Sequence, residues 1–91
     1  MTDLTSIEAE ILRQTEARGP DKSICPSEVA RVLAQGGAPE TWQRFLTAVR
    51  RAAVRLAAAG RIEILRKGKP IDPAETRGVI RLRMRPDAGT P

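Results

Sequence analysis

Residues 40–59 constrain the fold of this chain most strongly, because their apolar side chains recur at the spacing of an α-helix. At about 100° per residue, one broad apolar face centres on Val49, while the opposite side carries mainly basic and small side chains. The residues that share the apolar face are Trp42, Phe45, Leu46, Ala52, Ala53 and Leu56. We therefore predict one long helix that buries this face and ends at Gly60, with a kink near Thr47 left open.

Two shorter helices are predicted before this segment. The first covers about 6–18, where Thr5 and Glu8 have the spacing of a capping box and a Gly-Pro pair ends the helix. The second covers about 26–35, because Pro26 suits a first helical turn and two glycines follow the last apolar residue. The chain thus supplies three helices, of which the third is the longest.

Strands are predicted after the long helix, because residues 61–65 and 80–84 alternate apolar and polar side chains. They should pair antiparallel, and the short extended segment around Ile24 can add a third strand. The side chains expected to face inward are Ile62, Ile64, Ile80, Leu82 and Met84. The connection, about 66–78, is rich in Gly and Pro and too long for a tight hairpin turn, so we expect a protruding loop.

Two strands cannot bury a face without help, so the hairpin must rest on the helices. The predicted fold is therefore α+β, a winged helix-turn-helix with three helices and a small antiparallel sheet. That sheet consists of a two-stranded wing and a short third strand near Ile24. Residues 1–91 form one domain, with an ordered core of about 5–85 and a frayed tail at 86–91.

Several segments also resemble a small bacterial family that is known only as a domain of unknown function with a winged-helix fold. The residues that carry the resemblance are 23–30 (SICPSEVA), Trp42, 49–53 (VRRAA), 56–62 (LAAAGRI) and 67–70 (KGKP). The resemblance covers about 6–85 and implies a winged helix and a bacterial origin. It implies no reaction, ligand or binding residue, so function must be argued from the side chains.

Positive charge is concentrated in one third of the chain. Residues 44–69 hold eight basic side chains and one acidic one (8 − 1 = +7), whereas 1–43 sum to 4 − 7 = −3 and 70–91 to 4 − 3 = +1, which gives the net +5. Such a local excess attracts polyanions, and it coincides with the predicted third helix and wing. The block therefore favours double-stranded DNA as the partner.

The residues expected to contact DNA lie on the outward side of the third helix and on the wing, and the contacts should be mainly with phosphates. They are Arg44, Thr47, Arg50, Arg51, Arg55, Lys67 and Lys69. Two alternatives stay open: a charged face that only keeps the domain in solution, or a strip at Val54 and Ala58 that docks another protein or a second copy. Asp72 and Glu75 on the wing disfavour a close approach to phosphates.

The chain lacks the residues that most kinds of catalytic site require. The chain has no His and no Tyr and a single cysteine, Cys25, which excludes Cys/His zinc sites and His-dependent nucleophiles and leaves no internal disulfide. It also has no phosphate-binding glycine loop, secretory signal or membrane-length apolar run. We expect a cytoplasmic protein that is not an enzyme and contacts no membrane, and the sequence indicates no metal, cofactor or small-molecule ligand.

Overall fold

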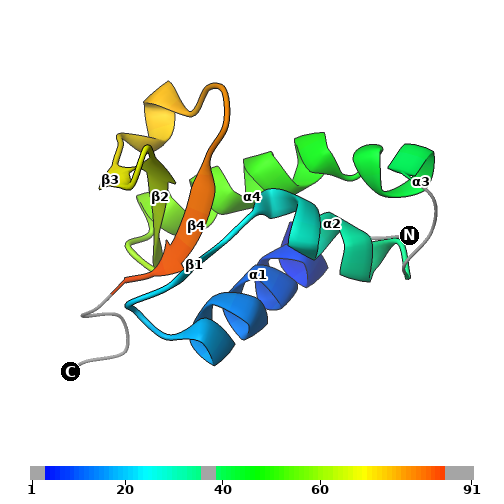
Figure 1. Cartoon of the computed structure of the whole chain (residues 1–91), viewed down its shortest axis with the longest axis horizontal. Helices are drawn as coiled ribbons and strands as arrows, with labels where there is room; N and C mark the ends of the chain where they lie inside the picture. Colours follow the sequence, from blue (N-terminus) through cyan, green and yellow to red (C-terminus); the bar gives the residue numbers. More distant parts are fainter. Residues whose placement is uncertain (1–3, 36–38, 86–91) are drawn as a thin grey trace.

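The computed structural model describes residues 4–35 and 39–85, which form a mixed α+β domain (Figure 1). Within these residues there are four α-helices, one short 3₁₀ helix (η1) and four strands in one antiparallel sheet of order β1-β4-β2-β3. The elements are α1 Leu4–Arg18, β1 Ser23–Ile24, α2 Pro26–Leu33, α3 Pro39–Gln43, α4 Leu46–Ala58, β2 Ile62–Arg66, β3 Lys69–Pro70, η1 Pro73–Glu75 and β4 Arg81–Met84. The predicted tail at 86–91 lies outside the described residues.

The sheet confirms the predicted pairing and adds one strand. β4 lies between β2 and β1, with Ile64 and Ile24 both opposite Leu82, so the antiparallel hairpin and the short strand near Ile24 are confirmed. On the other face, Glu63 lies opposite Arg83 and accepts its Nη2–H at 2.5 Å. Such cross-strand pairs fix the register of a small sheet.

The segment predicted to form one long third helix instead forms two helices, α3 and α4, with a break between them. At the break the amide of Phe45 donates to the Trp42 carbonyl three residues back, at 3.0 Å, and α4 then starts with the Val49 amide on the Phe45 carbonyl. The bend therefore falls at Arg44–Phe45 and slightly before Thr47. Neither residue at the break is Gly or Pro, so the sequence left a kink open near Thr47 but did not place it at Arg44–Phe45.

The connection between β2 and β4 is also different from the prediction. Its first part is a tight two-residue turn, in which Lys67 and Gly68 have φ of +53° and +80°, and β3 then pairs with β2. This is the backbone of a type I′ turn, which Gly favours because it lacks a Cβ. η1 contacts α4, and Gly78 after it accepts a hydrogen bond from Arg50, so the connection folds back on the helix and does not simply protrude.

α1 starts at Leu4, two residues before the predicted position, and Thr5 lies inside the helix. The predicted capping box at Thr5 and Glu8 is therefore wrong. The geometry occurs instead at the start of α2, where the Cys25 amide donates to the Glu28 carboxylate at 2.7 Å and the Glu28 amide donates to the Cys25 carbonyl at 2.9 Å. α2 ends at Leu33, and the glycines predicted to end it lie outside the described residues.

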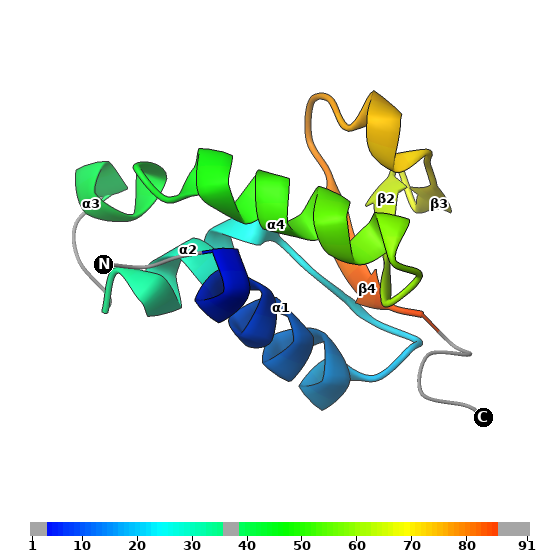
Figure 2. The same ribbon diagram turned by 180° about the vertical axis from the view of Figure 1, so that it is seen from behind.

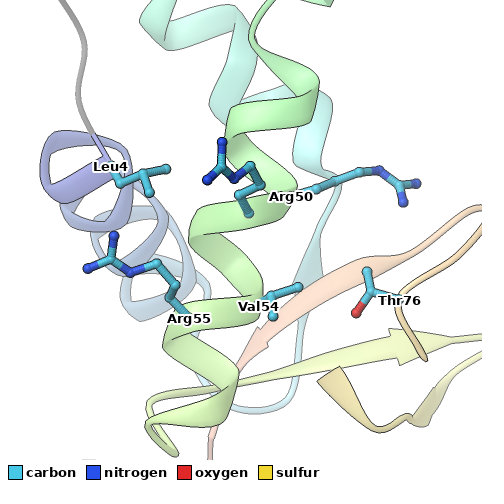
Figure 3. Close-up of a pocket in the computed structure, with 6 residues that line it drawn as sticks. Leu4, Arg50, Val54, Arg55 and Thr76 are labelled. Atoms are coloured by element: carbon cyan, nitrogen blue, oxygen red, sulfur yellow. The ribbon is translucent and has the colours of Figure 1, made fainter. Parts of the chain in front are cut away.

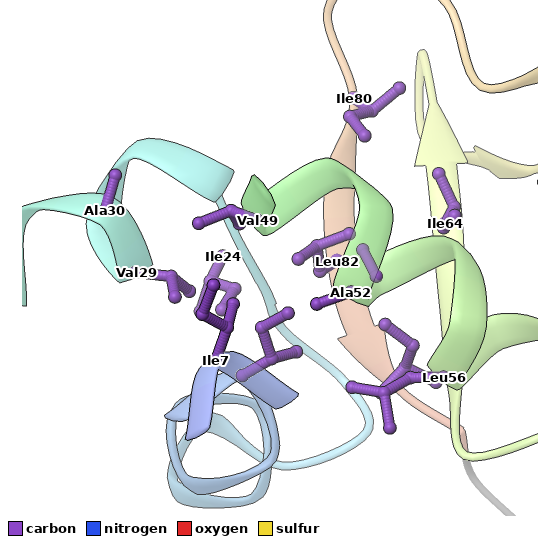
Figure 4. Packing of buried hydrophobic residues seen from close by; sticks show 13 residues of the cluster. Ile7, Ile24, Val29, Ala30, Val49, Ala52, Leu56, Ile64, Ile80 and Leu82 are labelled. Atoms are coloured by element: carbon purple, nitrogen blue, oxygen red, sulfur yellow. The ribbon is translucent and has the colours of Figure 1, made fainter. Parts of the chain in front are cut away.

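The core lies where α4 crosses α1 and α2 and meets the inner face of the sheet, as Figures 2 and 4 show. Its buried side chains are mainly branched aliphatic ones, with small alanines on α4 where helices approach closely. The largest fully buried apolar side chains are Ile7, Ile11, Ile24, Val29, Val49, Ile64, Ile80 and Leu82. Trp42 and Met84, both predicted to face inward, are half-buried, while Leu65 is buried although its alternation predicted otherwise.

Candidate nucleic-acid interface

The outward side of α4 is a narrow strip. The helix is surrounded by α1, α2, β2 and η1, which leaves Thr47, Arg51, Arg55 and Ala58 exposed, with Arg44 exposed in the turn before the helix. The buried residues on the other side are Val49, Ala52, Ala53 and Leu56. The apolar pattern of the sequence thus located the strip correctly, because a helix face that is buried determines the face that is not.

Arg44 and Arg51 have no charged partner among the residues that the structure describes. Across residues 4–35 and 39–85, neither guanidinium takes part in an ion pair or a side-chain hydrogen bond. Both side chains are exposed, and Thr47 is exposed between them in sequence. Residues 44–51, from the turn before α4 into its first half, are therefore the part of this region best able to bind an anion.

Arg55 is held differently. Its Nε lies 3.0 Å from Oε2 of Glu8 on α1, and the Glu8 side chain is only 19% exposed against 56% for Arg55. The carboxylate cancels much of the positive field at this point, and a phosphate would have to compete with it. Sequence reasoning missed this contact because it had assigned Glu8 to a helix cap.

Arg50 contacts the backbone of the β2–β4 connection. Its Nη2 donates a hydrogen bond to the carbonyl oxygen of Gly78, and its side chain, predicted at the flank of the outward face, is half-buried. Figure 3 shows Arg50 and Arg55 extending to opposite sides of α4. Leu4 lies on the side of Arg55, and Thr76 lies on the side of Arg50. Arg50 therefore joins the returning connection to the helix.

Between these two arginines α4 carries a shallow hollow of about 430 Å³. Its lining combines an apolar floor with cationic walls: Leu4, Arg50, Arg51, Val54, Arg55 and Thr76. Val54 is half-buried here, so the apolar strip predicted at Val54 and Ala58 is smaller than the sequence indicated. The hollow brings together three of the arginines predicted to bind DNA.

Lys67 and Lys69 are exposed at the β2–β3 turn, away from the other candidates. Figure 1 shows this turn and the α3–α4 junction near opposite ends of the long axis. Near the turn, Arg66 and Arg77 line a small hollow of about 260 Å³ together with Glu75. Arg77 was not among the predicted contacts, because it follows the basic block in the sequence and only the fold of the connection places it beside Arg66.

Asp72 and Glu75, the two acidic residues predicted to disfavour a close approach to phosphates, both lie on this connection. The Asp72 side chain accepts the Ala74 amide at 2.9 Å and so caps η1, while Glu75 shares its hollow with two arginines. Both carboxylates therefore have local electrostatic or hydrogen-bonding roles. Within the described part of the chain, no three acidic, Cys or His side chains gather in a way that could hold a metal ion.

A second arginine cluster lies on α1 and α2, and there each guanidinium has a partner. Arg13 contacts Glu10 at 2.6 Å, Arg18 contacts Glu28 at 3.3 Å, and Arg31 lies 5.0 Å from the centre of the Trp42 ring. The hydrogen bond from Arg13 lowers the pKa of Glu10 below its usual value. The same bond raises the pKa of Arg13, so both partners stay charged.

The chain is thus a small α+β domain that presents a basic helical strip and a basic hairpin turn. It belongs to the family described as "Protein of unknown function (DUF3253)", which it matches over residues 5–85, and this confirms the resemblance seen in the sequence. A search of curated proteins found no match. None of the helices in the described residues combines the length and the apolar content needed to cross a membrane.

Proposed function

We propose that this chain is a winged-helix protein that binds double-stranded DNA, chiefly through phosphates, and acts in transcriptional regulation. The strand order β1-β4-β2 and the placement of α4 directly before the hairpin support a winged-helix assignment. In this assignment α3 and α4 together are the recognition helix, and the β2–β4 connection is the wing.

The observation that carries the proposal is the positive charge of Arg44 and Arg51 on the exposed strip beside Thr47, which no carboxylate of residues 4–35 and 39–85 pairs. A bare guanidinium offers several donors to phosphate oxygens and displaces condensed counterions when it binds. Arg50 and Arg55 supply weaker support, because one is bonded to Gly78 and the other to Glu8. Lys67 and Lys69 would hold phosphates farther along the duplex.

Contacts with the DNA backbone should outweigh base readout. The strip is narrow, and Ala58 at its end and the half-buried Val54 beside it have side chains that cannot donate hydrogen bonds to base edges. Thr47 is the polar side chain best suited to a thymine methyl group or a phosphate. The protein should therefore bind many duplex sequences with similar affinity and strong salt dependence.

A salt series with a labelled duplex tests the proposal. Affinity should fall linearly in log salt, with a slope near −0.9 for each phosphate contact. Arg51→Glu should weaken binding strongly while the helical circular dichroism stays unchanged, because Arg51 is exposed. Absence of duplex binding at low salt would remove the proposal.

The alternative is a protein-interaction or self-association module with no role on nucleic acid. The apolar floor formed by Leu4 and Val54 in an open hollow favours it. Sedimentation of the native chain beside Val54→Glu tests self-association, and a native chain that is monomeric at high concentration contradicts a homodimer. We further propose a non-enzymatic, cytoplasmic protein of bacterial origin, supported by the absent His and Tyr, the lone cysteine and the family resemblance.

A further inference from the structure

A second hollow, of about 460 Å³, lies on the side of the domain where the start of α2, the α3–α4 region and the segment before β4 meet. Its walls are largely apolar and come from Pro26, Trp42, Leu46, Val79 and Ile80, with Arg50 at its edge. The volume is within the range of sites that bind small organic molecules, and such sites combine apolar walls with a few polar groups. We call it the Trp42 groove.

Val79 contributes exposed apolar surface to this groove. Its side chain is 85% exposed, and among the described residues only Val32 is a comparable exposed large hydrophobic, at 46%. Most valines lose this exposure on folding, because burial of an aliphatic side chain removes apolar surface from water and stabilises the folded state. A bound apolar group resting on Val79 and Trp42 would recover part of that free energy.

The charge around the Trp42 groove is positive. No Asp or Glu of the described residues lines it, and Arg50 contributes a guanidinium that gives one hydrogen bond to Gly78. A guanidinium has five N–H donors, so donors remain for a carboxylate. Arg31 adds positive charge beside the Trp42 ring, while the carboxylate of Glu28 is bonded to the Cys25 amide and to Arg18.

From this combination we propose that the Trp42 groove binds a small soluble molecule with an apolar ring and a single carboxylate. The ring lies against Trp42, Leu46 and Val79, and the carboxylate pairs with Arg50. No such ligand was expected from the sequence, because the residues that line the groove are far apart along the chain and meet only in the fold. The inference does not depend on DNA binding, since no nucleic acid takes part.

Two matched probes test the proposal: naphthaleneacetate, an apolar carboxylate, and naphthaleneacetamide, its uncharged counterpart. Each is titrated into the full isotope-labelled chain while the backbone amides and the Trp42 indole N–H are followed by NMR. The acid should shift the signals of Leu46, Gly78, Val79 and the indole, and should bind about tenfold more tightly than the amide. Equal affinity of the two probes would refute the assigned carboxylate contact.

Val79→Asp should weaken naphthaleneacetate binding by about tenfold or more, because it removes apolar surface and adds a repelling charge. Val32→Asp is the matched control, since it changes the other exposed valine, in the hollow between α1 and α2, and should leave the affinity unchanged. Arg50→Gln should abolish the preference for the acid over the amide. If neither probe binds, or if the shifts centre on Val54 and Thr76, the proposal is wrong.

Discussion

Arg44, in the turn before α4, and Arg51, on α4, differ from the arginines of α1 and α2 in what surrounds them. Arg13, Arg18 and Arg31 each face a carboxylate or an aromatic ring, whereas Arg44 and Arg51 face no internal partner within the described residues. A count of positive side chains would have ranked the two surfaces as similar. The pairing decides which surface projects a field into solvent, because a neighbouring carboxylate cancels most of a guanidinium's field beyond a few ångströms.

Arg55 is intermediate between the two surfaces. It belongs to α4 by sequence, but its partner Glu8 comes from α1, so the exposed strip loses charge at its C-terminal end. The comparison teaches that a basic helix face is useful for binding anions only where neighbouring elements leave it unneutralised. The following four predictions test this distinction.

The largest effect is expected from Arg44→Gln combined with Arg51→Gln. Removal of both unpaired guanidiniums should weaken duplex binding about a hundredfold at low salt, because about two phosphate contacts are lost. Arg13→Gln combined with Arg18→Gln removes the same charge from α1 and should change the affinity by less than about threefold. Fluorescence anisotropy measures both, and equal losses would contradict the distinction between the two surfaces.

The β2–β3 turn should give the next largest effect. Lys67→Asn with Lys69→Gln should reduce the slope of log affinity against log salt by about 1.8 and weaken binding about tenfold at low salt. Asn is chosen at position 67 because Lys67 has φ of +53°, which Asn tolerates better than most residues. An unchanged slope would mean that this turn lies off the duplex.

Glu8→Gln should strengthen duplex binding by about threefold, because it frees Arg55 to act as Arg51 does. Glu10→Gln is the matched control: it makes the same change of charge on the same helix, but its partner Arg13 lies on the surface with paired arginines. The control should leave the affinity nearly constant. A gain of equal size in both variants would point to net charge and away from the local pair.

The smallest effect concerns the paired surface itself. Because Arg13 lowers the pKa of Glu10 in the folded state, ionised Glu10 favours folding above its usual pKa of 4.5, and this contribution is lost as the pH falls through the folded value. At neutral pH it should stabilise the fold by about 0.5 kcal/mol or less, because solvent screens the pair. Urea unfolding of native chain and Glu10→Gln at neutral and acidic pH should show a small difference that disappears in acid.

Much of the fold could be predicted from periodicity. The apolar face of α4 and the alternation of β2 and β4 arise from local rules, since a buried face requires apolar residues at every turn or every second position. The break at Arg44–Phe45 and the return of the β2–β4 connection could not be predicted in this way. The kink left open near Thr47 did not locate the break, and the glycines and prolines of the connection indicate a loop but not its direction; both features depend on contacts with other elements.

The candidate site was predicted less completely than the fold. Exposure of Arg44, Thr47 and Arg51 follows from the helix period, but the partners of Arg50 and Arg55 are distant in sequence: Gly78 and Glu8. Arg77 and the Trp42 groove were missed for the same reason. A side chain's neighbours across elements are not encoded in its local pattern.

The amino-acid sequence by itself determined where charge accumulates, which helix face is buried and where β2 and β4 lie, because each depends on residue type at short, regular spacing. Only the tertiary structure decided which positive charges stay unneutralised and where apolar surface is left open beside Val79. The physical reason is range: an ion pair or a groove forms when side chains come within a few ångströms, and long separations along the chain carry no information about that distance.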